Sequence, residues 1–195
     1  ITEWNGANWT LINDPYTHPI SDASLINKVS GWAVASQFPI SYGNILYWDG
    51  NKWEKDQPTN ALTLDFVPGS SGTEGWAGGV FGSLYYWDNT TWTEVNSPAN
   101  VDINAIDILS SNDIWAVGGG YDISLSESHG TIIHRDENAW GVVMSPTSIL
   151  TDIDMVSKDI GWAVGEDGAI FQWKGQSWEE FSSPTTSDLK GICML

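Results

Sequence analysis

The chain has 195 residues, of which 25 are acidic and 7 are basic, so its formal net charge is −18. An acidic surface disfavours nucleic acids and anionic membranes as partners, and the 41% hydrophobic content is too high for a disordered chain. The lone cysteine, Cys193, excludes an internal disulfide and a cysteine-based zinc site, and no apolar run is long enough to span a bilayer.

The predicted strands follow a repeating order along the chain. Residues 1–15 hold two short strands, the first ending at the turn Asn5-Gly6 and the second starting at Trp9. Four longer units follow, at about 20–58, 59–98, 99–146 and 147–184. Each unit contains an apolar run, a Trp-Ala core, an aromatic run and a run built on a further tryptophan, and each ends at a proline. Residues 185–195 match the first run of such a unit.

All 13 tryptophans fall into three columns of this repeat. The columns are Trp32, Trp76, Trp115 and Trp162; Trp4, Trp48, Trp87 and Trp173; and Trp9, Trp53, Trp92, Trp140 and Trp178. A unit of about 40–50 residues with four short strands is typical of a β-propeller blade. No segment keeps a helical apolar period, and a two-sheet sandwich does not predict one four-strand unit repeated in order. We therefore predict an all-β propeller.

The prediction comprises four complete blades and a split fifth, made from residues 185–195 and 1–15. The split blade lacks a second strand. Either the ring closes around an incomplete blade, or the chain is a piece of a longer array, which its abrupt start and stop favour. An incomplete blade also leaves open self-association through an unpaired edge.

The pattern Gly-Trp-Ala-Val-Gly-x-x-Gly-x-Ile-x-x-Trp-x-Gly-x-x-Trp is best preserved at 161–178. It resembles the repeats of neuraminidase-type (Asp-box) and photosystem-assembly-factor-like propellers. The resemblance implies the fold far more strongly than a function. Asp49 and Trp53 are one residue closer than in a strict Asp-box. Sialidases grip their substrate with three arginines, whereas this chain has only Arg135, which replaces the usual tryptophan.

The tryptophan columns suggest either packing between blades or sugar-stacking platforms, and their fixed positions favour packing. Trp48, Trp87 and Trp173 lie near hairpin ends, where we expect partial exposure. An acidic column, Asp65, Asp107 and Asp154, continues at Asn27 and Cys193. It forms either a cation-holding ring or a set of structural acceptors for backbone N–H groups, and we favour the latter. We expect Cys193 to be a buried thiol.

No catalytic, metal or cofactor site is expected. The histidines, His18, His129 and His134, form no zinc-like pair, and no Gly-x-Ser-x-Gly elbow is present. The acidic segment at 166–168 is typical of a tight turn rather than a calcium loop.

Two connections between second and third strands are longer than the others, at 35–44 and 118–131. The matching connections need only residues 79–83 and 165–169. Such insertions project from one face of a propeller and often bind partners. The candidate contact residues there are Phe38, Tyr42, Tyr121, Asp122, Glu127 and His129. We expect His129 to be exposed.

Asn8 and Asn89 begin N-glycosylation sequons, which mildly favour secretion. The sequence therefore predicts a non-catalytic extracellular or cell-surface module that binds a protein or glycan on this loop face. A carbohydrate-binding or carbohydrate-acting propeller and an assembly-factor-like protein binder are the alternatives.

Overall fold

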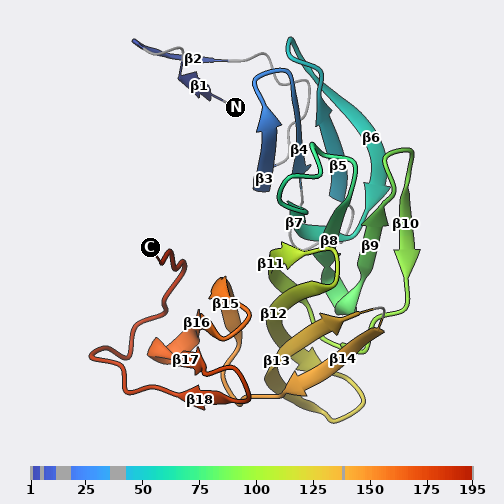
Figure 1. Cartoon of the computed structure of the whole chain (residues 1–195). Helices are drawn as coiled ribbons and strands as arrows, with labels where there is room; N and C mark the ends of the chain where they lie inside the picture. The colour runs from blue at the N-terminus through green and yellow to red at the C-terminus, as the bar shows by residue number, and fades with distance from the viewer. Residues whose placement is uncertain (1, 5–6, 12–18, 36–42, 138, 195) are drawn as a thin grey trace.

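The computed structural model of the chain describes residues 2–4, 7–11, 19–35, 43–137 and 139–194. Four separate four-stranded antiparallel sheets follow one another along the chain and form an arc around a common axis (Figure 1). The first strand of each sheet lies on the inner side of the arc. This arrangement confirms the predicted β-propeller blades.

The first two blades contain eight strands. Blade one consists of β3 (Ile20–Asn27), β4 (Ser30–Ala35), β5 (Gly43–Trp48) and β6 (Trp53–Thr59). Blade two consists of β7 (Ala61–Phe66), β8 (Gly75–Gly79), β9 (Leu84–Trp87) and β10 (Trp92–Val95). A short 3-10 turn, Val80–Gly82, connects β8 to β9.

Blades three and four repeat this order. Blade three consists of β11 (Ile103–Ser110), β12 (Asp113–Asp122), β13 (Glu127–Asp136) and β14 (Ala139–Met144). Blade four consists of β15 (Leu150–Ser157), β16 (Ile160–Gly165), β17 (Ile170–Trp173) and β18 (Trp178–Glu180). The 3-10 turn Glu166–Gly168 connects β16 to β17. The four predicted Trp-Ala cores all lie in second strands, as expected.

The second strands of blades two and three are buried on both faces because each of these blades has a neighbouring blade on either side. The whole of β8 is buried, and β4 and β12 are nearly so. This explains why the Trp-Ala cores show no polar–apolar alternation in the sequence.

Tryptophans join each blade to the next, which confirms the packing interpretation. Trp32 of blade one contacts Trp87 of blade two, with ring centroids 4.6 Å apart. Trp115 of blade three contacts Trp173 of blade four at 4.9 Å. The expected partial exposure is wrong for Trp48 and Trp87, which are buried. Their indole N–H groups donate to backbone carbonyls of the turns between first and second strands, and this holds the rings against the sheet.

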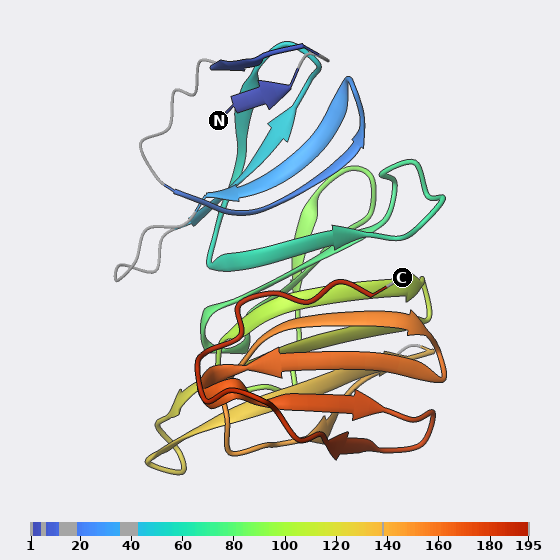
Figure 2. The same ribbon diagram turned by 90° about the vertical axis from the view of Figure 1, so that its left-hand side faces the viewer.

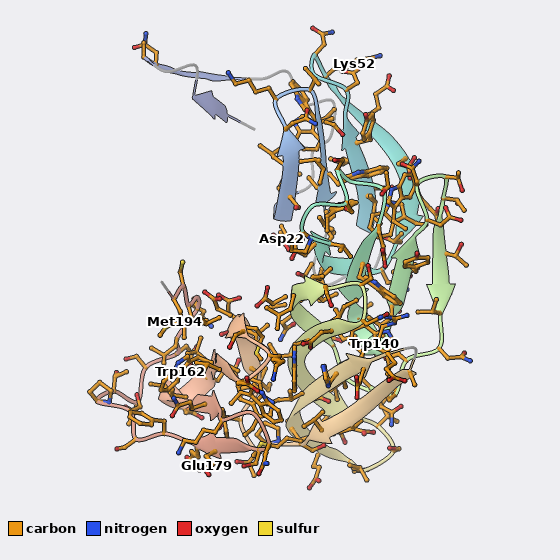
Figure 3. All side chains as sticks on the ribbon, in the orientation of Figure 1. Asp22, Lys52, Trp140, Trp162, Glu179 and Met194 are labelled. Carbon is orange, nitrogen blue, oxygen red and sulfur yellow. The ribbon has the colours of Figure 1, made fainter. Side chains whose placement is uncertain are left out.

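Blade four is packed against a neighbouring four-stranded blade, blade three, on one face. Trp162 is only half-buried there, and its ring contacts the exposed Phe181 at 5.3 Å. Trp140 and Trp162, both labelled in Figure 3, belong to β14 and β16.

The two ends of the chain form separate features in the structure. β1 (Thr2–Trp4) and β2 (Trp9–Leu11) form a two-stranded hairpin. Residues 189–194 form no strand but run along β15, where the backbone N–H of Ile192 donates to Asp152 at 2.7 Å (Figure 2). This is the position of an inner strand without a second strand to pair with it. Cys193 is exposed, not buried as expected, because no sheet encloses the segment.

Among the described residues, no helical segment has the length and apolar character that crossing a membrane requires.

Candidate functional site

The most distinctive feature of the chain is the hairpin between β12 and β13. Each strand has 10 residues, whereas the matching strands β8 and β9 have 5 and 4. The pairing continues from Asp113↔Asp136 to Asp122↔Glu127. The segment 118–131 is therefore not the open loop that its polar sequence suggested. It extends the blade beyond the length that its neighbours need.

A buried carboxylate holds the turn of this hairpin. One Asp122 oxygen accepts hydrogen bonds from the Ser124 hydroxyl at 2.5 Å and the Ser124 backbone N–H at 2.7 Å. These bonds, the Ser124 hydroxyl first, lower the pKa of Asp122 to about 2. Asp122 is only 3% exposed, so its carboxylate serves the turn rather than a partner.

His129 supports the same turn. Its Nδ1 donates to the Gly130 carbonyl at 2.7 Å, and its Nε2 lies 3.4 Å from Asp122. The Gly130 carbonyl, with the Asp122 carboxylate, raises the pKa of His129 because both stabilise the protonated ring. The ring is partly buried, not exposed as expected.

The end of the hairpin presents apolar side chains to solvent. Tyr121, Ile123 and Leu125 are 59%, 76% and 59% exposed. Glu127 is also exposed. Large apolar groups rarely gather on a surface without a contact to make, so this tip is a candidate docking element.

Another exposed apolar residue lies in the short turn of the neighbouring blade. Phe81 is 66% exposed and adopts a left-handed backbone with φ of 54°. Blade four has Asp167 at the same place, with φ of 56°. Aspartate tolerates this conformation far better than phenylalanine. Folding alone therefore does not account for an exposed Phe81.

The two features lie on the same face of the propeller, because both connect a second strand to a third. We define the tip surface as Phe81, Tyr121, Ile123 and Leu125. The sequence singled out only Tyr121 among these four. Phe38 and Tyr42, predicted to contribute to the same face, lie outside the described residues.

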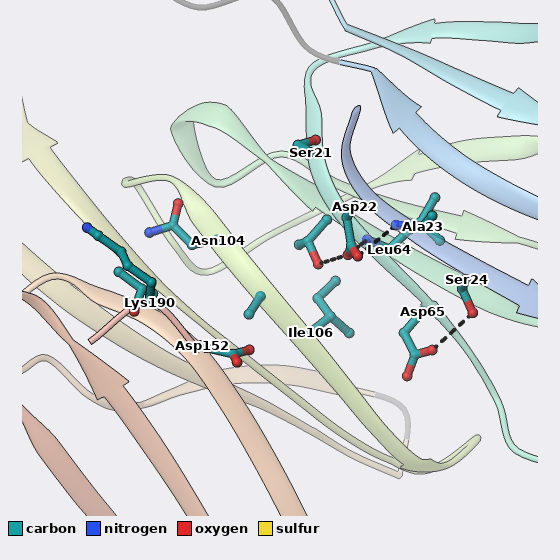
Figure 4. A pocket seen from close by; sticks show the side chains of 13 residues that line it. Ser21, Asp22, Ala23, Ser24, Leu64, Asp65, Asn104, Ile106, Asp152 and Lys190 are labelled. Atoms are coloured by element: carbon teal, nitrogen blue, oxygen red, sulfur yellow. Dashed lines mark hydrogen bonds between the residues drawn. The ribbon is translucent and has the colours of Figure 1, made fainter. Parts of the chain in front are cut away.

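A polar pocket of about 360 Å³ lies between the inner strands (Figure 4). Its lining includes Asp22, Asp65, Asn104, Asp152 and Lys190. Burial, with the nearby Asp107 and Asp22 charges, raises the pKa of Asp65 to about 6. Burial also raises the pKa of Asp107 and of Asp152.

Most of these carboxylates join neighbouring blades. Asp107 accepts the backbone N–H of Met155, and Asp154 accepts that of Met194, at 2.5 and 2.6 Å. The structural interpretation of the acidic column is thus confirmed for Asp107 and Asp154, whereas the bond from the neighbouring blade to Asp65 comes from a side chain, the Ser24 hydroxyl, at 3.4 Å. The residue that matches it in blade one is Ser24, which pairs with Trp32, and not Asn27 as the sequence suggested. Within the described ranges, no cluster of three or more acidic, His or Cys side chains is arranged to hold a metal ion.

Comparisons with known proteins support the fold. No protein-family model matches the chain, and no curated protein matches it. The solved structure of YCF48 bound to D1 peptide is similar, with a TM-score of 0.63 and 19% identity over 93% of this chain and 59% of that one. U3-55K gives a TM-score of 0.62 at 12% identity, over 90% of this chain and 55% of the other.

The WD40 β-propeller domain of Doa1 is also similar, with a TM-score of 0.61 and 11% identity over 91% of this chain and 59% of that one. The chain thus spans less than two thirds of each of these structures. At such identities the likeness shows a shared β-propeller fold.

Proposed function

We propose that this chain is a non-catalytic protein-binding module and that the tip surface docks an apolar segment of a partner. The observation that carries the proposal is Phe81, an exposed phenylalanine in a left-handed turn for which blade four has aspartate. A strained residue that does not help folding is expected where a function requires it. The similar YCF48 structure with a bound peptide gives independent support for a binding role on this fold.

The preferred partner segment is apolar and neutral or basic. The apolar side chains of the tip supply buried area on binding, while the chain as a whole has a net charge of −18 and repels acidic partners. The hydrogen bonds from Ser124 to Asp122 make the turn rigid, which lowers the entropy lost on binding.

Phage display of random peptides on the purified chain tests the proposal. The Phe81→Asp variant copies blade four, and Ile123→Ser with Leu125→Ser removes the apolar hairpin end. We expect enriched apolar or basic peptides, at least tenfold weaker binding to the triple variant and a melting temperature no lower than that of the parent. Val143→Ser, which removes an exposed apolar side chain from β14, is the matched control. Equal binding to the triple variant would refute the docking role.

A glycan is the second candidate ligand, because the rings of Phe81 and Tyr121 are exposed and suited to stacking on sugars. Binding on a glycan array that Tyr121→Ser abolishes, without any peptide enrichment, would favour this alternative.

We further propose an extracellular or cell-surface location. The support is that Asn89, the first residue of one sequon, is exposed in a turn with φ of 72°. Expression through a eukaryotic secretory pathway is expected to give a glycan at Asn89, seen as a mass shift that Asn89→Gln removes. A secreted chain that carries no glycan at Asn89 would remove this support.

A further inference from the structure

Arg135 stands in blade three where the other blades have a tryptophan. Trp48, Trp87 and Trp173 donate their indole N–H to a carbonyl in the turn between first and second strands, at 3.2, 3.0 and 2.9 Å. Arg135 donates to the Ser111 carbonyl in the same way. Its structural task is thus one that an uncharged tryptophan performs elsewhere in the chain.

The replacement changes the contact between blades two and three. At the interfaces on either side, three tryptophans meet: Trp32 with Trp87 and Trp92, and Trp115 with Trp173 and Trp178. Between blades two and three, Trp76 contacts Trp140 at 5.4 Å, and the guanidinium of Arg135 lies 5.1 Å from the Trp76 ring. Two tryptophan rings and a guanidinium therefore meet at this interface, where three tryptophan rings meet at the other two.

A pocket of about 490 Å³ lies at this interface. Its walls are the rings of Trp76 and Trp140 together with Val95 and Pro98, and its polar groups come from Asn96, Ser97 and Arg135. It therefore combines apolar walls with one permanent positive charge.

The polar groups of the pocket have unused hydrogen-bonding capacity. No carboxylate within the described ranges forms an ion pair with Arg135, although the chain has 25 acidic residues. The guanidinium has several donors, and among the residues that the structure describes it bonds only to the Ser111 carbonyl.

The indole N–H of Trp76 is also without a partner among the described residues, and this ring is only 4% exposed. Trp140 shares that property with Trp53, Trp92 and Trp178, so it belongs to the repeat, but among the second-strand tryptophans Trp76 alone has it. Buried donors without acceptors are uncommon in proteins, so the polar groups at this interface are incompletely satisfied among the described residues.

We propose that this pocket binds a carboxylate carried by an apolar group. The planar guanidinium suits a carboxylate through two parallel N–H···O bonds, and stacking on Trp76 fixes its plane. The apolar part of the ligand packs on Trp140, Val95 and Pro98. Arg135 lies near the end of β13 opposite to the hairpin tip, so this site is separate from the tip surface.

Two sources present such a carboxylate, the C-terminus of a peptide and a free organic acid. We would titrate the chain with phenylacetate and with N-acetyl-Ala-Ala-Phe, and compare phenylacetamide and the C-terminally amidated peptide, following tryptophan indole N–H signals by NMR. The expected result is that at least one acid binds tenfold or more tightly than its amide. Binding of the tripeptide alone would identify a peptide C-terminus, and binding of phenylacetate would show that a free acid suffices.

The variant Arg135→Trp restores the residue of the other blades. We expect it to keep the melting temperature and to lose binding of the acid at least tenfold, while Arg135→Lys retains part of it. Arg135→Gln serves if the tryptophan variant does not fold. Lys158→Gln makes the same change in net charge at an exposed site and should bind like the parent. Equal affinity for acid and amide, no shift with either acid at millimolar concentration, or full binding by Arg135→Trp would overturn the proposal.

Discussion

The carboxylate of Asp22 accepts the backbone N–H of Leu64 at 3.0 Å and thereby joins the inner strands of blades one and two. The same oxygen accepts the Thr63 hydroxyl at 2.8 Å. Asp152 repeats the arrangement with the N–H of Ile192. The inner edge of the propeller is thus held by carboxylates that reach from one blade to the next.

Removing this acceptor should destabilise the chain. We expect Asp22→Ala to lower the free energy of unfolding by about 1–3 kcal/mol, because it leaves the Leu64 N–H without its acceptor. Urea denaturation followed by fluorescence measures the change. The matched control, Glu180→Ala at an exposed position of β18, should change stability by less than about 0.5 kcal/mol. Equal effects of the two variants would contradict the conclusion that Asp22 stabilises the contact between blades one and two.

Asp65 should make stability depend on pH. Its folded pKa, about 6, lies above the usual value, so its stabilising contribution is complete below pH 3.8 and is lost as the pH rises through 6. Asp65→Asn should therefore raise stability at pH 7 by about 1–2 kcal/mol, less than the shift alone implies because the carboxyl is partly exposed. Urea midpoints from pH 4 to 8 measure this. Parallel pH profiles for the parent and the variant would contradict it.

The buried tryptophans should differ in their importance according to their blade. Trp115 is 1% exposed and packs on two rings of blade four, so Trp115→Ala is expected to cost about 3–5 kcal/mol. Trp162 occupies the same position in blade four but is half-buried, so Trp162→Ala should cost less than half as much. Thermal and urea unfolding of the two variants test the difference, which vanishes if Trp162 is as well packed as Trp115.

Protonation of His129 should tighten the hairpin tip. Its folded pKa is raised, so the stabilisation it gives is complete at low pH and is lost as the pH rises through that value. Asp122 and Glu127 are the charged groups that favour the protonated ring. We expect faster hydrogen exchange at the Ser124 and Leu125 amides at pH 8 than at pH 6, after correction for intrinsic rates. His129→Gln should remove this dependence, and a dependence that persists in it would assign the effect elsewhere.

The repeat made the fold predictable from the sequence. The three tryptophan columns mark equivalent positions in each blade, and every blade must fill the same wedge against its neighbour. The acidic column was also interpretable, because an aspartate in an inner strand needs hydrogen-bond donors. The column was assigned to the wrong residue in blade one, because Ser24 is neither acidic nor aromatic and its equivalence to the aspartates cannot be recognised from the sequence.

The candidate site was harder to predict. The sequence predicted a long connection over 118–131, yet strand pairing continues to Asp122 and Glu127, and the hydrogen bonds from Ser124 to Asp122 hold the turn. Exposure of Phe81 depends on a left-handed turn, and that turn becomes visible only when Val80–Gly82 is compared with Glu166–Gly168. The Arg135 substitution was visible in the sequence, but the pocket beside it depends on packing between two blades.

The tryptophan clusters and the carboxylates that accept hydrogen bonds from the next blade also determine how the chain unfolds. Each blade is a separate hydrogen-bonded sheet, and neighbouring blades contact one another through side chains, so each blade is stabilised only by its nearest neighbours when the chain unfolds. Blades two and three each have a neighbouring blade on both faces, so we expect them to unfold last. The β12–β13 hairpin and Arg135 therefore both belong to the more durable half of the molecule.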